Sequence, residues 1–460
     1  MDSSSRRSLC EKLRAVCRGE VWERLDERAS LATDFGGMYR VVPMLVLRPL
    51  SVEDVQAALR VAAETNTTVS LRGAGHSQSG QGLGTGLLLD MTSLNRIVDF
   101  QPSDRSIEVE AGITWRAVVD ASFAQRLLPV ALTHAVDTTV GGTLSVGGIG
   151  SAGWSYGPQV DNISYLDVVT ASGELIRCSL EQEPALFDAV RAGLGQCGVI
   201  VRAGLRLRPC GSRIVTRTFV YRELENLVGD VPKLTAELDR DRLIAVRVGR
   251  DPMRKGHLMA ALFVGQDLTN DQPNPTPLPT LHSDFAPPVS DHSTWRADGQ
   301  PGHPYFKVFG TNQPPTHGQR KNPWMDFFFP LPDALAALAA LAAEPSGLLY
   351  RGPAEIIFVA RGSNPAPLLV TPPVPMAMGL GVFPSFGPED AADPVSVMST
   401  YAGMMSRCGG RRYFCGYFAP SDVEDWTGRY GETWSRFAES KARLDPSFRF
   451  GSNLMRWRAE

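Results

Sequence analysis

The stretch Leu71-Arg72-Gly73-Ala74-Gly75-His76-Ser77 is the most informative part of this 460-residue chain. The strand-like run Thr67-Thr68-Val69-Ser70 precedes it, which places the glycines in a turn at the end of a strand. Glycines let the backbone fold tightly, so that its N–H groups can approach an anionic ligand. The stretch therefore predicts either an ordinary turn or a diphosphate cradle with the His76 imidazole beside the ligand.

A second glycine-rich segment runs from Val140 to Gly150 and holds five glycines in eleven residues. So many glycines would destabilise a core element, because glycine loses more backbone entropy on folding than any other residue. The segment indicates either a close strand crossing or a backbone that lies against a ligand. Within it, Gly148 to Gly153 has the spacing G-x-G-x-x-G. We reject a dinucleotide fold there, because no apolar strand precedes the glycines and Trp154 to Pro158 does not resemble a helix start.

A third glycine-rich stretch, Gly193-Leu194-Gly195-Gln196-Cys197-Gly198, lies where a predicted helix ends and a strand begins. Glycine commonly follows the last turn of a helix, because it adopts the left-handed conformation at little cost. Taken alone, this stretch indicates no more than a helix cap.

Helices and strands mix along the chain without strict alternation. The pattern predicts helices over residues 51–66, 115–127, 184–194, 331–343 and 422–443, and strands over residues 67–71, 86–91, 106–110, 166–171, 174–178 and 199–207. Residues 267–304 contain eight prolines and predict a long loop. This mixture favours the α+β class over a doubly wound parallel sheet.

Composition excludes several classes of protein. A formal net charge of −3 argues against a nucleic-acid or membrane-surface partner. No apolar run approaches the roughly 18 residues of a membrane-spanning helix, and residues 1–30 lack the apolar core of a secretory signal. The seven cysteines include no C-x-x-C pair, so we expect no metal site and a reduced, cytoplasmic setting.

In their order and spacing, the three glycine-rich stretches resemble the FAD-binding domain of the p-cresol methylhydroxylase (PCMH) and vanillyl-alcohol oxidase superfamily, and most of all cytokinin dehydrogenases. The tail pattern W-x-R-F-x-x-x-K-x-x-x-D-P of that family is matched by Trp434, Arg436, Phe437, Lys441, Asp445 and Pro446. The resemblance implies a two-lobed FAD-binding domain over residues 1–210, with its PCMH-type core at about 40–210. It also implies a substrate domain over residues 211–409, built on an antiparallel sheet with helices, and a segment 410–460 that returns to the FAD-binding domain.

The resemblance also implies the cofactor and its contacts. FAD would be bonded covalently to His76 through the flavin 8α-methyl group, which raises the reduction potential of the flavin. A second covalent bond is not expected, because Ala135 stands where a related branch has a cysteine. The other residues implied to contact FAD are Gly73, Ala74, Gly75, Ser77, Gln81, Thr139, Gly142, Ser145, Ile149, Ile200 and Asn453.

The candidate catalytic residues are His134 and Tyr417. Cytokinin dehydrogenases have a proton-accepting aspartate at the position of His134; here the imidazole either acts as the base or has no proton role. Asp137 would replace that carboxylate only if the loop shifts. Tyr417 would face the flavin. Further aromatic residues are either cavity walls or ordinary core: Trp154, Tyr156, Trp324, Phe327 and Phe329.

The function implied by the resemblance is that of an FAD-dependent oxidoreductase. It would remove a hydride from a C–H group next to N or O of a small organic substrate, such as a secondary-metabolite intermediate. O2 or another acceptor would then reoxidise the flavin. Two alternatives stay open: oxidative cyclisation or alcohol oxidation by the same flavin, and a flavin-binding protein without turnover.

Overall fold

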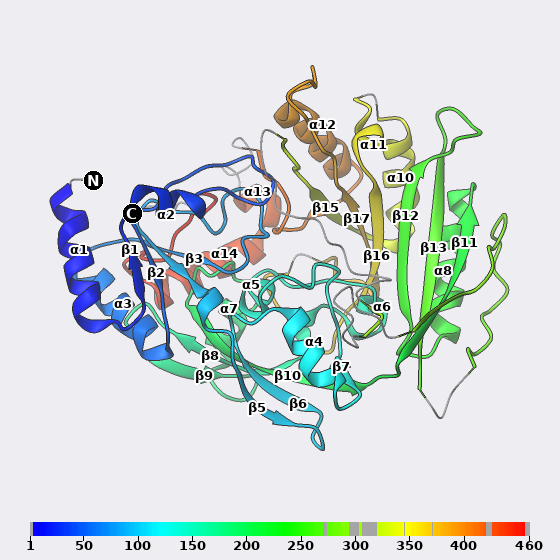
Figure 1. Cartoon of the computed structure of the whole chain (residues 1–460). Helices are drawn as coiled ribbons and strands as arrows, with labels where there is room; N and C mark the ends of the chain where they lie inside the picture. Colours follow the sequence, from blue (N-terminus) through cyan, green and yellow to red (C-terminus); the bar gives the residue numbers. More distant parts are fainter. Residues whose placement is uncertain are drawn as a thin grey trace.

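The computed structural model describes residues 3–269, 274–293, 303–305, 320–344, 346–369, 371–419 and 426–455. Three sheets with flanking helices make up this described part (Figure 1). Two sheets lie in the N-terminal half of the sequence, and the third is formed by strands from Arg213 onward. The α+β class and the antiparallel sheet expected from the sequence are confirmed.

The first sheet has the strand order β1 (Glu20–Trp22), β2 (Leu45–Arg48), β4 (Leu87–Asp90), β3 (Val69–Arg72). Strands β2, β4 and β3 are parallel. Helices α1 (Ser3–Val16) and α3 (Val52–Glu64) share a buried core with this sheet. Helix α3 begins where the sequence predicts, because the Ser51 hydroxyl accepts a hydrogen bond from the Asp54 backbone N–H at 3.4 Å. The glycine turn follows β3 directly, so this lobe positions it.

The second sheet is antiparallel and is centred on the long strand β10 (Val199–Pro209). Its order is β5 (Ile97–Gln101), β6 (Ser106–Glu110), β10, β8 (Ile163–Val169), β9 (Leu175–Cys178), and β7 (Leu127–Pro129) also pairs with β10. Its helices are α4 (Trp115–Phe123), α5 (Val140–Leu144), α6 (Gly153–Tyr156) and α7 (Pro184–Val190). The second and third glycine-rich stretches belong to this lobe.

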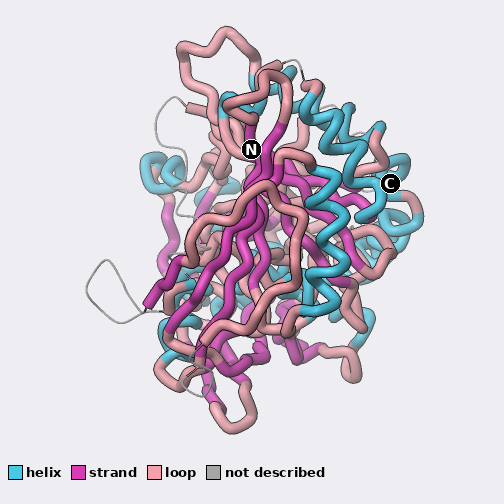
Figure 2. The backbone as a smooth tube through the Cα atoms, turned by 90° about the vertical axis from the view of Figure 1, so that its right-hand side faces the viewer, coloured by secondary structure: helices cyan, strands magenta, loops and turns pink. Residues whose placement is uncertain are grey.

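The third sheet has eight strands, all antiparallel to their neighbours. Its order is β14 (Ser290–Ser293), β11 (Arg213–Tyr221), β13 (Leu258–Leu268), β12 (Leu243–Arg250), β16 (Ala354–Ala360), β17 (Met376–Val382), β15 (Met325–Pro330), β18 (Arg411–Arg412). Helices α8 (Leu224–Glu237), α10 (Ala334–Ala342) and α12 (Pro394–Arg407) pack on it in one buried cluster. Figure 2 views the long strands from the side of this sheet, with helices beside them.

The two faces of this third sheet differ, as strand β15 shows. Phe327 and Phe329 point into the core beneath the helices, whereas Phe328 belongs to the core shared with the second lobe. This follows from the alternation of side chains along a strand. Phe327 and Phe329 are therefore core residues and not cavity walls. The face that carries Asp326 and Phe328 is turned toward the first two lobes.

Three segments differ from the sequence-based expectation. Helix α4 ends at Phe123, because Leu127 begins strand β7. One helical turn, α6, begins at Gly153, where the sequence indicated no helix start. In the proline-rich segment, β13 extends to Leu268 and β14 adds an edge strand; residues 270–273 and 294–302 of it lie outside the described residues.

The C-terminal segment folds back onto the glycine-rich stretch 193–198. Helices α13 (Trp426–Tyr430) and α14 (Glu432–Leu444) form most of it, and residues 422–425 of the expected helix lie outside the described residues. Lys441 and Asp445 form a fully buried ion pair, with 2.6 Å between Nζ and Oδ2. Lys441 Nζ also donates to the carbonyls of Gln196 at 2.8 Å and Phe450 at 2.6 Å. The tail pattern seen in the sequence is thus a buried clamp on the third glycine-rich stretch.

In the described part of the chain, no helix combines the length and apolar character needed to cross a bilayer.

Candidate functional site

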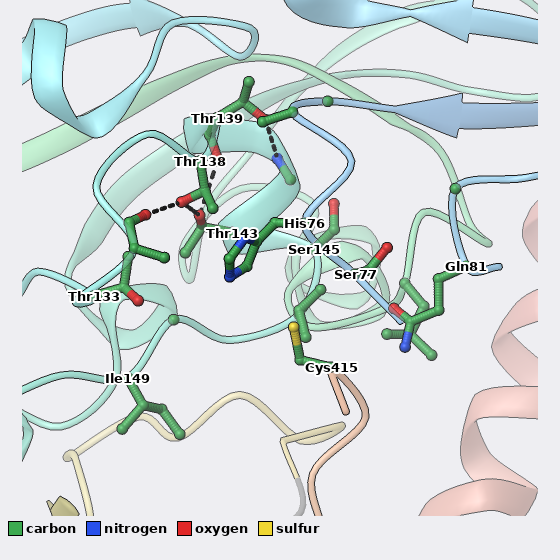
Figure 3. A pocket seen from close by; sticks show the side chains of 18 of the residues that line it. His76, Ser77, Gln81, Thr133, Thr138, Thr139, Thr143, Ser145, Ile149 and Cys415 are labelled. Carbon is green, nitrogen blue, oxygen red and sulfur yellow. Dashed lines mark hydrogen bonds between the residues drawn. The ribbon is translucent and has the colours of Figure 1, made fainter. Parts of the chain in front are cut away.

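A cavity of about 250 Å³ opens where the three glycine-rich stretches meet the free face of the third sheet. Figure 3 shows His76 and Cys415 reaching into it from different segments, the glycine turn and the chain after β18. The cavity therefore combines a glycine-rich side contributed by the first two lobes with a side-chain-rich wall contributed by the third sheet.

The turn after β3 presents unused backbone donors to this cavity. Among the described residues, none of the five backbone N–H groups from Gly73 to Ser77 donates to an acceptor in the protein. Gly75 has φ +72°, and a Cβ there would lie 2.3 Å from Nη2 of Arg72. The Arg72 guanidinium thus lies directly against the turn. Consecutive free N–H groups backed by a cation are what an anionic group such as a diphosphate requires.

The second glycine-rich segment forms the short helix α5 at the side of the cavity. Thr139 Oγ1 accepts a hydrogen bond from Gly142 N–H at 3.3 Å and caps the helix. A Cβ on Gly141 would lie 2.7 Å from the Cβ of Ala111, while Gly142 and Gly148 line the cavity. The close strand crossing considered from the sequence is not found, because the segment forms helix α5; its glycines pack against Ala111 and line the cavity.

The third stretch also reaches the cavity and is more than a helix cap. Leu194 and Gly195 line the cavity, with φ values of +55° and +68°. Leu194 N–H donates to the Ser145 carbonyl at 2.8 Å, which ties this turn to the end of α5. A left-handed backbone at a non-glycine residue costs free energy, and such residues cluster at functional sites.

His76 lies between aromatic neighbours inside the cavity. Its ring centroid is 4.2 Å from that of Phe35 and 6.2 Å from that of Trp324. Burial lowers the pKa of His76 to about 4, although the carboxylate of Asp137 opposes this shift. The imidazole is therefore neutral at neutral pH and keeps a nitrogen lone pair that can act as a nucleophile.

A row of residues crosses the third sheet on the cavity side. Gly381 of β17 is directly opposite Asp326 of β15 and also directly opposite Glu355 of β16. Directly opposed residues point to the same face of an antiparallel pair, so both carboxyl groups lie on the cavity face. A second row follows the same pattern, with Gly379 between Phe328 and Ile357. All six residues line the cavity, and the two glycines leave room above the central strand.

The two carboxyl groups of the first row have opposite electrostatic environments. Burial raises the pKa of Asp326 to about 7, and the negative charge of Glu355 adds to this rise. Burial also disfavours the ionised form of Glu355, but the His134 ring and Arg247 outweigh it and lower the pKa of Glu355. Glu355 is thus the charged member of the pair at neutral pH, and Asp326 exchanges its proton near neutrality.

His134 lines the cavity next to Glu355, as the sequence predicts a cavity position for it. Its Nε2 is 2.6 Å from the Ser151 hydroxyl, and its Nδ1 is 3.8 Å from Oε2 of Glu355. Both ring nitrogens therefore face protein groups. Asp137, the other candidate carboxylate, does not line the cavity; it pairs with Arg116 at 2.6 Å.

The residues expected to contact FAD come together with one exception. The cavity is lined by Gly73, Ala74, Gly75, His76, Ser77, Gln81, Thr139, Gly142, Ser145, Ile149 and Ile200. Asn453 lies against Gly80 and is not among the lining residues. Tyr417 is buried in the core of the third sheet, next to Tyr39, and Tyr413 lines the cavity instead.

Of the aromatic candidates for the cavity wall, Trp324 lines the cavity, where it stacks on Phe383 with 6.0 Å between centroids. Trp154 belongs to the core beneath the third sheet, and the Tyr156 hydroxyl donates to Asp241. Asp326 and Glu355 were not predicted from the sequence. A single acidic residue in each of two otherwise apolar strands, Met325–Pro330 and Ala354–Ala360, could have indicated them.

One cluster of possible metal ligands lies outside the cavity. Among the described residues, Cys210, Asp267 and His303 bring their ligand atoms within 4.8 Å of one another. Asp267 already accepts hydrogen bonds from Gly211 N–H at 2.8 Å and His303 Nε2 at 3.3 Å, and Arg208 lies 3.7 Å away. Asp267, His303 and Arg208 thus form a buried polar network in which Arg208 offsets the charge of the carboxylate.

Comparisons with known proteins agree with this geometry. Residues 43–179 match the family of FAD binding domains. The chain is 41% identical over 212 residues to an uncharacterised oxidoreductase, ORF5 of the fasciation locus of Rhodococcoides fascians, covering 46% of this chain and 48% of that protein. It is 34% identical over 216 residues to cytokinin dehydrogenase 3 of Arabidopsis thaliana, covering 46% and 41%. The chain thus spans about half the length of the curated relatives that it matches, or less.

A solved structure extends the likeness to the whole chain. The fold matches 6-hydroxy-D-nicotine oxidase from Arthrobacter nicotinovorans with a TM-score of 0.69 and 20% identity, over 96% of this chain and 98% of that one. At this identity the match shows the fold alone. The chain thus contains an FAD binding domain at residues 43–179 and shares the α+β fold of that oxidase along nearly its whole length.

Proposed function

We propose that this chain is an FAD-dependent oxidoreductase that removes a hydride from a C–H group next to nitrogen in a small organic substrate. Residues 1–210 and 410–460 would hold the cofactor, and residues 211–409 would shape the substrate side. One observation carries the proposal: a single cavity joins the donor-rich glycine turn to the acidic and aromatic wall of the third sheet. Cofactor and substrate sites that share a cavity are what hydride transfer requires.

The residues around the glycine turn fit FAD. The unused N–H groups of Gly73 to Ser77 and the Arg72 guanidinium would bind the diphosphate. The apolar side chains of Met91, Val199 and Ile200 line the cavity and would pack against a planar ring. When bound, FAD supplies the two-electron acceptor of the reaction.

We propose further that His76 holds the flavin covalently. A low pKa keeps its imidazole neutral, and Phe35 and Trp324 fix its ring inside the cavity. A neutral, positioned imidazole is a competent nucleophile. Cys415 also lines the cavity, but burial raises the pKa of its thiol and keeps it protonated, so it is a poor nucleophile. We therefore keep the expectation of a single covalent bond.

The acidic wall favours an amine as the hydride donor. Glu355 and Asp326 line the cavity, and the cationic Arg72 belongs to the opposite side with the glycine turn. A carboxylate donor would be repelled from this wall, whereas an ammonium group would be attracted to it. Trp324, Phe328 and Phe383 add aromatic surface for the rest of the substrate. The relatives named cytokinin dehydrogenase and 6-hydroxy-D-nicotine oxidase agree with a small organic substrate.

The test is anaerobic mixing of the purified flavoprotein with a matched donor panel: N-methylbenzylamine, benzylamine and benzyl alcohol. Loss of the visible flavin absorbance with the amines supports the proposal. Bleaching by the alcohol alone would favour alcohol oxidation. A bound flavin that dithionite reduces but that no donor reduces would favour a flavin-binding protein without turnover. Readmission of O2 then separates an oxidase from an enzyme that needs another acceptor.

A further inference from the structure

We infer that Asp326 is the group that accepts the proton of the donor amine, and that His134 and Glu355 form a positioning pair beside it. This inference rests on the proposed function and assigns the proton step to the substrate wall. It differs from the expectation based on the sequence, in which His134 is the base.

Asp326 lies in strand β15 on the wall of the cavity. Its carboxyl group leans over the bare backbone of Gly381, since a Cβ on that glycine would lie 2.1 Å from Oδ1 of Asp326. Asp326 lines the cavity together with Phe328 of the same strand. Glycine at position 381 therefore leaves the space that this carboxyl group occupies on the cavity face of the sheet.

The side chains of Asp326 and His134 differ in their hydrogen-bond partners. Among the described residues, the Asp326 carboxyl oxygens accept no hydrogen bond, and neither oxygen is among the fully buried unpaired polar atoms. His134, in contrast, faces Ser151 with Nε2 and Glu355 with Nδ1. A proton acceptor needs an available lone pair within reach of the substrate. Asp326 has it, whereas His134 is placed to hold Glu355 in position.

Four titratable groups determine the electrostatic environment of Asp326. Glu355 from β16, Tyr401 from α12, and Tyr413 and Cys415 after β18 interact with it electrostatically. Burial keeps the tyrosine and cysteine groups neutral, because it raises their pKa values. Glu355 is thus the charged neighbour, and it disfavours ionisation of Asp326 until a cation arrives. An Asp326 pKa of about 7 suits a group that takes up and releases protons near neutral pH.

The hydride that leaves the amine carbon with its electron pair would be taken up by the two-electron acceptor that bound FAD supplies. The amine loses the N–H proton to the Asp326 carboxylate, so that a C=N bond replaces the C–N single bond. Asp326 then returns its proton to solvent after the product leaves. Glu355 stays ionised throughout and stabilises the positive charge that develops on the substrate.

The test compares anaerobic flavin reduction by N-methylbenzylamine between pH 5 and 9 in the wild type and in two variants, Asp326→Asn and His134→Gln. In the wild type we expect the rate to rise through an apparent pKa near 7. Asp326→Asn should lower the rate by about 10²- to 10⁴-fold and remove this inflection. His134→Gln should keep the inflection. Asp333→Asn, at an exposed carboxylate of the same domain, is the matched control and should change nothing.

A second measurement does not depend on turnover. Trimethylbenzylammonium carries a permanent charge and has no N–H proton. Its affinity for the holoprotein, measured by calorimetry, therefore reports whether the Asp326 carboxyl group is ionised. Asp326→Asn should weaken its binding by about tenfold or more at pH 8 and hardly at all at pH 5. Equal weakening at both pH values, or an inflection lost in His134→Gln and kept in Asp326→Asn, would overturn the inference. Suppose that dithionite reduces the wild-type flavin, that no amine does, and that cation binding behaves as expected. The proposed amine oxidation is then wrong, and the assignment of Asp326 as the ionisable group of the cavity wall stands.

Discussion

Asp326 and Glu355 lie on either side of Gly381 in one cross-strand row, and the missing side chain of that glycine leaves the space that the Asp326 carboxyl group occupies. Two carboxyl groups so placed cannot both ionise easily in a poorly solvated site. The His134–Glu355 contact settles which one carries the charge. The arrangement thus yields one fixed anion and one group that exchanges its proton.

Adding a methyl group at Gly381 should displace Asp326. The Cβ of Gly381→Ala would meet Asp326 Oδ1 at 2.1 Å, so the carboxyl group must move. We expect FAD to be retained, because the flavin-binding stretches are untouched, and amine-driven flavin reduction to fall at least tenfold. Stopped-flow absorbance measures this rate, and the visible spectrum measures the retained FAD.

Gly249→Ala is the matched control, since it also adds a methyl group to a strand of the same sheet. Gly249 has no atom within 4 Å of the added Cβ, so this variant should behave as the wild type. Full amine oxidation in Gly381→Ala would show that the position of Asp326 does not matter to the reaction.

The raised pKa of Asp326 also predicts a pH-dependent cost in stability. Between the pKa of an unfolded aspartate, about 3.9, and about 7 in the native state, the native protein binds more protons than the unfolded chain. Stability therefore falls as the pH rises through this window and levels off above pH 7. Asp326→Asn removes the cost, so its free energy of unfolding should exceed that of the wild type at pH 8, on the order of 1–3 kcal/mol after allowance for water in the cavity.

Urea unfolding at pH 8 and pH 4.5 checks this prediction. The advantage of Asp326→Asn should shrink at the lower pH, where the wild-type carboxyl group is protonated in the native state. A variant that is less stable than the wild type at pH 8 would mean that Asp326 makes stabilising contacts as an anion.

Local patterns were enough to predict the glycine-rich side of the cavity. The turn at 73–77, the cap at Ser51 and the glycines of 140–150 follow from short stretches of sequence, because turn geometry and helix caps are local. The acidic wall depends on the register of β15, β17 and β16, which pairs residues far apart in the chain. Single-sequence periodicity does not contain that register.

The sequence led us to expect Tyr417 in the cavity, whereas Tyr413 lines it, and strand pairing again explains the difference. Both tyrosines lie in one short segment after β18, and the sequence does not say which side chain faces the cavity. The pairing of Arg411 and Arg412 with β15 decides it, since it places Tyr413 beside Phe328, with 5.4 Å between ring centroids. Gly379 and Gly381 are two residues apart in the strand Met376–Val382, so they lie on the same face of the sheet. This spacing could have indicated a face with little side-chain cover.

Breaking the buried clamp in the tail should destabilise the protein strongly. Lys441→Met leaves the Asp445 carboxylate without its cation in a fully buried site and removes donors to the Gln196 and Phe450 carbonyls. We expect a loss of about 3–5 kcal/mol in the free energy of unfolding, measured by urea denaturation.

Arg436→Met provides the comparison on the same helix. Arg436 pairs with Glu432 at 2.6 Å on an exposed surface, where water and salt screen the charges, so the loss should be much smaller. Equal losses in the two variants would show that burial of the Lys441–Asp445 pair is irrelevant to stability.

The central claim, that the cavity beside the glycine turn holds FAD with His76 bonded to the flavin, is tested most directly by acid denaturation of the purified protein. We predict that the yellow colour stays with the wild-type polypeptide and that His76→Ala, which keeps the free N–H groups of the turn, releases it into solution. Colour released from the wild type would contradict the covalent bond. A well-folded protein without any flavin would contradict the claim as a whole.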